Sequence, residues 1–336
     1  MQENIIIPKN YKSALSLRET QHAIKYIKDM FQQMLSAFLV LDRVTAPLIV
    51  SADSGINDDL NGTERKVRFG VNAVECDAEV VQSLAKWKRL ALYRYGYRHG
   101  EGIYTDMNAV RRDDITDNIH SVFVDQWDWE KVIDVSERNV EFLKDTVRAV
   151  VKAIAVTNRK VGLRYPDIKV HIADEPFFVT AQELEDMYPD ADPKERENLI
   201  TKEHGTVFVI GIGGKLKSGR SHDGRAPDYD DWALNGDLLV WHARLGIALE
   251  ISSMGIRVDA AALDRQLKER NAEDRYKYEY HRLIRDGVLP YTIGGGIGQS
   301  RLCMLMLDKA HIGEVQASVW SEQTLKQCKQ AGIELL

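Results

Sequence analysis

Residues 291–307 read YTIGGGIGQSRLCMLML, and this is the most informative stretch of the chain. Positions 294–298 hold four glycines, which cost backbone entropy and so indicate a close approach that side chains would block. The pattern predicts a strand up to Gly296 and then a helix with Arg301 in its first turn. A helix N-terminus favours an anion or an electron-rich ring, and an arginine there can stack on a base or pair with a phosphate. A tight strand-to-helix junction without any ligand explains this stretch equally well.

The two familiar nucleotide-binding loops do not match these residues. A P-loop requires Gly-Lys-Ser/Thr after its glycines, whereas Gln299, Ser300 and Arg301 follow here. The dinucleotide fingerprint requires a third glycine at the position of Gln299. Any nucleotide site in this region is therefore of another kind.

The composition is that of an ordinary globular chain of 336 residues, with 44% hydrophobic and 29% charged residues. The length suggests about two domains, but no linker, repeat or low-complexity tract divides the sequence, so a single domain over residues 1–336 is predicted. A net charge of −6 argues against a nucleic-acid binder, which usually has a basic face.

Three further features indicate a soluble cytoplasmic protein. No apolar run approaches the roughly 20 residues that span a bilayer, and the start MQENIIIPKNYKS does not resemble a signal peptide. The three cysteines, Cys76, Cys303 and Cys328, have no paired spacing, which argues against disulfides and zinc sites. We therefore expect no membrane association and a reducing compartment.

The hydrophobic periodicity predicts an α+β fold, a mostly antiparallel sheet flanked by helices, because hairpins outnumber βαβ units. The expected helices cover residues 13–41, 78–95, 134–157, 272–286 and 299–310. The expected strands cover residues 43–50, two segments within 101–130 that a loop joins, and residues 168–172, 206–212, 237–242 and 248–252.

Two of these segments carry more than secondary structure. Pro47 interrupts RVTAPLIV, so this strand should lie at a sheet edge or an interface, because proline donates no ladder hydrogen bond. The polar loop GGKLKSGRSHDGRAPDYDDWALNG has no helical period, and long loops of this kind are usually functional or disordered.

Strand alternation places one set of residues together before position 131. The set that shares a face is His120, Val122, Val124, Gln126, Asp128 and Glu130. Polar groups gather at the far end of this face, which is unusual for a plain core strand.

Several charged residues are candidates for a nucleotide and an acidic substrate. Arg111 ends a strand and suits a bidentate grip on phosphate, although a surface ion pair is the commoner role of such an arginine. Glu250 and Ser252 lie in period-two register, with Arg257 a short turn later. A carboxylate such as Glu250 or Asp237 could hold Mg²⁺ and the arginine a substrate carboxylate, or the strand's polar face could simply be solvated.

The helix that carries SLAKWKR raises a choice between two lysines. Ser83 and Lys86 are three positions apart and can share a face, whereas Lys86 and Lys88 cannot, so at most one lysine should point inward. His120 and His222 lack a metal-type partner spacing, and no G-x-S-x-G motif indicates a covalent nucleophile. Together the glycines, arginines and carboxylates predict ATP-dependent activation of an acidic substrate.

The motifs resemble a known superfamily. RVTAPLIV, near residues 43–50, resembles motif 1 of the class II aminoacyl-tRNA synthetases, with Pro47 as its proline. NAVRRDD and HSVFVDQWDWE, within residues 103–130, resemble motif 2, and GGGIGQSRL, within residues 292–307, resembles motif 3 with Arg301 as its arginine.

A closer resemblance, over nearly the full chain, is to the ammonia-dependent asparagine synthetases, or aspartate–ammonia ligases. HSVFVDQWDWE, GIGGKLKSGRSHDGRAPDYDDW and TIGGGIGQSRL carry it, whereas QSLAKWKR and EISSMGIR each differ from the family pattern by one residue. The resemblance implies a homodimer joined through motif 1 and the reaction of aspartate, ATP and ammonia to asparagine, AMP and pyrophosphate. It implies a β-aspartyl adenylate, because hydroxide is a poor leaving group and AMP a good one.

The resemblance also assigns roles to residues. Arg111 would grip the α-phosphate and Arg301 the ATP end at motif 3, while Asp237 and Glu250 would hold Mg²⁺ with ATP. The residues implied near the rest of ATP are His120, Ser121, Val124, Ser252 and Gly296. The residues implied around aspartate or asparagine are Ser83, Lys88, Gln126, Asp128, Asp230, Ser253 and Arg257. Asp58 would orient the amino group or the incoming ammonia, and Lys88 rather than Lys86 would belong to the site.

Three rival classes fit the sequence less well. A tRNA-dependent aspartyl or asparaginyl synthetase would carry an anticodon-binding barrel ahead of motif 1, and the mostly helical segment before Pro47 does not resemble one. A synthetase-like binding protein should have lost the motif residues, yet Arg111, Arg301 and Glu250 are present. A glutamine-dependent asparagine synthetase requires an N-terminal cysteine, and position 2 is Gln2.

Overall fold

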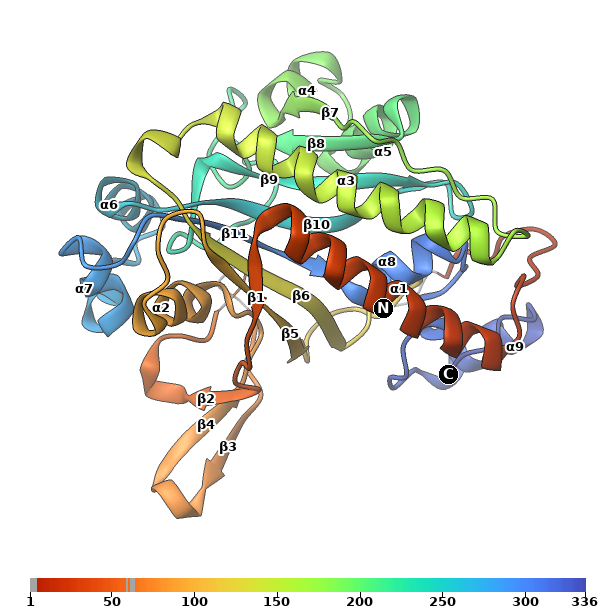
Figure 1. Cartoon of the computed structure of the whole chain (residues 1–336), viewed down its shortest axis with the longest axis horizontal. Coiled ribbons are helices and arrows are strands. Elements are labelled where there is room, and N and C mark those ends of the chain that lie inside the picture. The colour runs from red at the N-terminus through yellow and green to blue at the C-terminus, as the bar shows by residue number, and fades with distance from the viewer. Residues whose placement is uncertain (1–4, 59, 61–63) are drawn as a thin grey trace.

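The computed structural model describes residues 5–58, 60 and 64–336, and its centre is a large sheet (Figure 1). Among these residues, eight strands form this sheet in the order β1-β5-β6-β11-β10-β9-β8-β7. The bounds in that order are Leu41–Arg43, Gly102–Val110, Phe123–Val132, Thr292–Gly298, Ile247–Arg257, Asp230–His242, Thr206–Ile210 and Phe177–Thr180.

The sheet is mixed, so the predicted fold class is confirmed in its main part and corrected at the edges. All neighbouring pairs from β5 across to β8 are antiparallel. The outermost pairs, β1 with β5 and β7 with β8, are parallel. Helices α4 (Ala181–Met187) and α5 (Pro193–His204) connect β7 to β8, and such a crossover sets two strands parallel.

Two long helices, α1 (Leu17–Leu39) and α3 (Val140–Arg164), run alongside each other over one face of the sheet (Figure 1). Ser16 and Glu19 form a capping box that begins α1, and Val40 in a left-handed conformation ends it. The ring of Phe31 on α1 lies 4.7 Å, centre to centre, from the ring of Trp127 on β6. Because side chains alternate along a strand, Gln126 and Asp128 turn to the opposite face.

A second sheet projects from the body in Figure 1. In the described part of the chain it contains β2 (Ile49–Ser51), β3 (Arg68–Val71) and β4 (Cys76–Val80) in the order β2-β4-β3. The remaining α-helices are α2 (Ala85–Tyr95), α6 (Ala260–Glu269), α7 (Glu279–Arg285), α8 (Gln299–Met306) and α9 (Glu322–Gln330).

Several predicted elements were wrong in type or extent. RVTAPLIV is not one strand: β1 and β2 belong to different sheets, and Pro47 lies in the link between them. The helix predicted over 78–95 begins only at Ala85, because residues 76–80 pair with β2 and β3 instead.

The predicted strand 168–172 forms no strand. The predicted helix 272–286 splits into a 3₁₀ turn, Glu273–Lys277, and α7, because Tyr278 between them is extended. The predicted helix 134–157 is α3, which begins six residues later at Val140 because Asp134 caps a separate 3₁₀ turn.

Candidate active site

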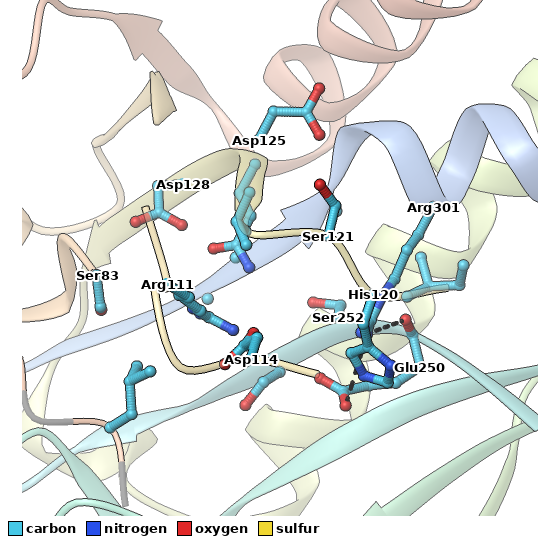
Figure 2. Close-up of a pocket in the computed structure, with 18 of the residues that line it drawn as sticks. Ser83, Arg111, Asp114, His120, Ser121, Asp125, Asp128, Glu250, Ser252 and Arg301 are labelled. Atoms are coloured by element: carbon cyan, nitrogen blue, oxygen red, sulfur yellow. Dashed lines mark hydrogen bonds and ion pairs between the residues drawn. The ribbon is translucent and has the colours of Figure 1, made fainter. Parts of the chain in front are cut away.

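A cavity of about 790 Å³ lies against β6, β10 and β11 (Figure 2). Its lining contains all but two of the predicted site residues: Ser83, Lys88, Arg111, His120, Ser121, Val124, Gln126, Asp128, Asp230, Glu250, Ser252, Ser253, Arg257, Gly296 and Arg301. The predicted face of β6 is thus turned to this cavity from Val124 to Asp128, while Trp127 and Trp129 are fully buried in the core behind it.

Arg257 forms an enclosed part of the cavity wall. Its Nε donates to Glu130 Oε1 at 2.9 Å, its Nη2 donates to Glu130 Oε2 at 2.7 Å, and its Nη1 donates to Asp230. The side chain is 2% exposed. The prediction that Arg257 follows a turn was wrong, because β10 continues through a bulge and Arg257 is its last residue.

Glu130 was placed on the correct face by its alternation but was not predicted as a site residue. Thr292 Oγ1 donates to Glu130 Oε1 at 2.7 Å, so both carboxylate oxygens are engaged. Burial acts to raise the pKa of Glu130, but Arg257, together with Lys88 and Thr292, holds this pKa below its usual range. Burial keeps the pKa of Asp230 above its usual range, although Arg257 opposes this shift. The arginine is therefore held between two carboxylates of different proton affinity.

Both lysines of α2 are buried, which contradicts the prediction that at most one points inward. Lys88 Nζ donates to the Gly295 carbonyl at 2.9 Å and lies 3.4 Å from Asp128 Oδ2. Lys86 Nζ lies 3.3 Å from Asp228 Oδ2 on another side of the helix. Other parts of the protein enclose both sides of α2, and each lysine pairs with its own carboxylate. Both side chains are therefore buried, although they point in different directions from the helix. Only Lys88 of the two lines the cavity, and burial lowers its pKa although Asp128 opposes the shift.

The glycines of the opening stretch lie inside β11, between β6 and β10. A Cβ on Gly294 would overlap the Glu130 carboxylate and lie 2.7 Å from Arg257 Nη2. A Cβ on Gly296 would lie 2.6 Å from Asp128 Oδ1. At Gly294 and Gly296 the close approach that the sequence indicated is therefore to polar side chains of the neighbouring strands, whereas a Cβ on Gly295 would meet Met254 of β10.

The other end of the cavity carries Arg111 and Arg301. Arg301 Nη1 donates to the Glu250 carbonyl at 3.1 Å, and its Nε donates to the Ile119 carbonyl at 3.3 Å. Arg111 Nε has no hydrogen-bond partner within the described residues, although the backbone of Arg111 is bonded to that of Val122. Figure 2 shows Arg111, Glu250 and Arg301 around one space, although they come from the loop after β5, from β10 and from α8.

Asp237 and Glu250, the two predicted metal ligands, lie on the paired strands β9 and β10. Asp237 does not line the cavity directly but forms an ion pair with Arg225, which does. Burial raises the pKa of Asp237 to about 7, with Glu250 adding to the rise and Arg225 opposing it. Burial also acts to raise the pKa of Glu250, but cations led by Arg301 lower it to about 2.

These two carboxylates supply too few donors to hold Mg²⁺ without a ligand that adds further oxygens. No group of three or more His, Cys, Asp or Glu side chains among the described residues is arranged to hold a metal ion. Mg²⁺ is commonly bound through one or two carboxylates plus substrate phosphates, and Asp237 with Glu250 fits that arrangement.

Asp58 is the second predicted residue outside the cavity lining. It is 1% exposed and lies near Tyr229, which does line the cavity. Burial, followed by the charges of Asp58 and Asp230, holds the pKa of Tyr229 well above its usual range.

Several residues that line the cavity were not predicted from the sequence. Asp114 follows Arg111 in the same loop, and Arg225 and Tyr229 belong to the long polar loop that was noted only as a functional candidate. Ile312 and Gln316 also line the cavity, and no local motif marks them. Gln316 reaches the site through hydrogen bonds from its Nε2 to Asp125 and Ser300, at 3.2 and 3.1 Å.

Solved structures with a similar fold define the class. The chain is similar to asparaginyl-tRNA synthetase from Pyrococcus horikoshii complexed with asparaginyl-adenylate, with a TM-score of 0.64 and 18% identity over 90% of this chain and 70% of that chain. It is also similar to aspartyl-tRNA synthetase from Entamoeba histolytica, with a TM-score of 0.60 and 17% identity over 88% of this chain and 58% of that chain. The fold is therefore that of the class II aminoacyl-tRNA synthetases.

Sequence comparison then gives the family. The profile of the aspartate-ammonia ligase family matches residues 18–332. Proteins named aspartate–ammonia ligase from Clostridium perfringens (strain SM101) and Ligilactobacillus salivarius are 56% and 55% identical over 335 residues, 99% of this chain and 100% of each relative. A protein of that name from Fusobacterium nucleatum is 56% identical over 326 residues, 97% of this chain and 99% of the relative. The chain belongs to the aspartate–ammonia ligase family.

Two general properties accompany this assignment. Within residues 5–58, 60 and 64–336, no helix is long and apolar enough to cross a membrane. Cys76, Cys303 and Cys328 are free thiols in this structure.

Proposed function

We propose that this chain converts L-aspartate, ATP and ammonia to L-asparagine, AMP and pyrophosphate through a β-aspartyl adenylate. The observation that carries the proposal is full-length membership of the ligase family, joined to one cavity with a buried arginine–carboxylate end and an arginine-lined end. The β-carboxylate attacks the α-phosphate, AMP becomes the leaving group, and ammonia then attacks the activated carbonyl.

The Arg257 end of the cavity suits aspartate. An arginine has five N–H groups, and the bonds to Glu130 and Asp230 leave one on each terminal nitrogen within the described residues. Two such N–H groups match the two oxygens of a carboxylate. Asp128 and Asp230 provide carboxylates for the ammonium group of the substrate, and Lys88 provides a second cation. Ser83, Gln126 and Ser253 complete this end in the proposal.

The opposite end suits ATP. Arg111 and Arg301 would bind the phosphates and stabilise the charge that develops during adenylation, so catalysis rests on alignment and charge stabilisation. His120, Ser121, Val124, Ser252 and Gly296 would surround the nucleoside. Asp237 and Glu250 would hold Mg²⁺, which would neutralise phosphate charge when bound.

Further parts of the proposal concern ammonia, assembly and compartment. Asp58, behind Tyr229, would orient ammonia or the amino group. A homodimer joined through the segment near residues 43–50 would cover apolar side chains there, since Leu48 is 54% and Ile49 45% exposed. We place the enzyme in the cytoplasm. A tRNA-dependent reaction is not favoured, because the relatives that match the whole chain are named as ammonia ligases.

The test is an assay of products with purified protein. Aspartate, Mg²⁺, ATP and ¹⁵N-ammonium without tRNA should yield AMP and ¹⁵N-asparagine in equal amounts. AMP that is released only after tRNA is added would contradict the proposal. Glutamine in place of ammonium is the control for the nitrogen source.

A further inference from the structure

Asp237, one of the two carboxylates proposed to hold Mg²⁺ with ATP, forms an ion pair with the guanidinium group of Arg225. Arg225 Nη2 donates to Asp237 Oδ1, and Arg225 Nη1 donates to the Gly224 carbonyl at 3.1 Å. The Arg225 side chain is 13% exposed and lines the cavity, whereas that of Asp237 is 4% exposed. The Arg225 side chain therefore lies between the Asp237 carboxylate and the cavity.

The charges nearby explain why a cation is needed there. Glu250 and Glu197 both act on Asp237 as like charges. Glu197 has its own partners, since Lys194 Nζ and His222 Nε2 lie 2.9 and 3.0 Å from its oxygens. A buried carboxylate beside other carboxylates is costly without a partner, and Arg225 supplies that partner for Asp237.

We propose that Arg225 and a divalent cation compete for Asp237. Mg²⁺ binds carboxylate oxygens at about 2.0–2.1 Å and would repel a guanidinium on the same group. In this proposal Arg225 leaves Asp237 when Mg²⁺ arrives with ATP and pairs with the phosphate oxygens that the metal brings. The inference rests on the proposed function and adds to it a phosphate-binding residue that also controls entry of the metal.

The geometry gives Arg225 the means to change partner. Within the described residues its Nε has no hydrogen-bond partner, so the guanidinium has donors available for phosphate. The residue lies on the loop between β8 and β9, whereas Asp237 is fixed inside β9. A divalent cation that binds without nucleotide has to displace Arg225 from Asp237, and it brings no phosphate with which Arg225 could pair instead. Mg²⁺ and ATP should therefore bind together rather than separately.

The test measures metal binding without nucleotide and nucleotide binding with metal. Mn²⁺ binding to the protein alone, followed by electron paramagnetic resonance, should tighten about tenfold in Arg225→Ala, the scale of one charge-assisted hydrogen bond. Mg·ATP binding, followed by calorimetry, should weaken about tenfold in the same variant. Arg220→Ala is the matched control, because Arg220 is an exposed arginine of the same loop and should change neither affinity.

Two further variants connect the effect to Asp237. The gain in Mn²⁺ affinity should disappear in the double variant Arg225→Ala/Asp237→Asn. If the alanine variant fails to fold, Arg225→Gln, which retains much of the side-chain volume, should likewise bind Mn²⁺ more tightly and Mg·ATP more weakly. Unchanged or weaker Mn²⁺ binding in the folded variant would overturn competition and leave Arg225 as a group that merely orients Asp237. Failure of the wild-type protein to form AMP and asparagine would instead contradict the proposed function, because the Mn²⁺ measurement requires no turnover.

Discussion

Substitution of Gly294 by alanine should damage the aspartate end of the cavity while it leaves the ATP end intact. The added methyl group would overlap the Glu130 carboxylate and lie 2.7 Å from Arg257 Nη2. The backbone of Gly294 is ordinary strand, so the methyl contact rather than backbone strain is the source of the effect.

The expected loss of aspartate affinity follows from the hydrogen bond that the added methyl group would disturb. Glu130 Oε2 accepts from Arg257 Nη2 at 2.7 Å, and this is the contact that the methyl group would push apart. One charge-assisted hydrogen bond contributes about 1.5 kcal/mol, so aspartate should bind about tenfold more weakly in Gly294→Ala.

The assay is the Michaelis constant for aspartate in AMP release, with that for ATP measured in parallel. Gly298→Ala is the matched control, because a Cβ there would come nearest to Arg301, with 3.3 Å to its Cβ, and would not touch Arg257. Wild-type aspartate affinity in a folded Gly294→Ala protein would refute the role of the glycine as room for the Glu130–Arg257 pair. An equal loss of affinity for ATP would show a general disturbance of the sheet instead.

Four other substitutions have defined outcomes. Arg301→Ala should abolish aspartate-dependent pyrophosphate exchange and leave the oligomeric state unchanged by light scattering, and retained exchange would remove the assigned role. Lys88→Met should lower kcat/KM for aspartate about a hundredfold, whereas Lys86→Met should reduce thermal stability more than turnover, because Lys86 pairs with buried Asp228 and does not line the cavity. Burial lowers the pKa of His242 to about 4 from an ordinary 6.5, so its contribution to stability is present above pH 6.5 and is lost as the pH falls towards 4. Urea unfolding of His242→Asn should therefore show a weaker loss of stability, by up to about 3 kcal/mol, across that window, and an unchanged pH slope would contradict this.

Local periodicity was sufficient to predict which residues of β6 share the face that lines the cavity. Val124, Gln126 and Asp128 were placed together by alternation alone, and the structure confirms it. Glu130 was on the same predicted face, but its partner Arg257 is 127 positions away, and nothing local indicates which arginine reaches it.

Burial by segments that are distant in the sequence explains the wrong prediction for the lysines of α2. Lysines are ordinarily solvated, yet Lys86 and Lys88 are both buried because separate carboxylates, Asp228 and Asp128, close over two sides of one helix. Gln316 shows the same limit, because its link to Asp125 depends on the path of the C-terminal segment past α8.

The cations at the two ends of the cavity are held differently, and this difference has a consequence for substrate selection. Arg257 and Lys88 are each 2% exposed and have carboxylate partners, so the charges at the aspartate end are positioned before substrate arrives. Arg301 is 21% exposed and holds backbone carbonyls of two separate segments, bonds that phosphate oxygens can replace. A prearranged end discriminates by geometry, since a ligand that cannot satisfy fixed charges leaves them unpaired. Discrimination between aspartate and its analogues should therefore reside in the Arg257 end, while the arginines of the ATP end adjust to the phosphates that they bind.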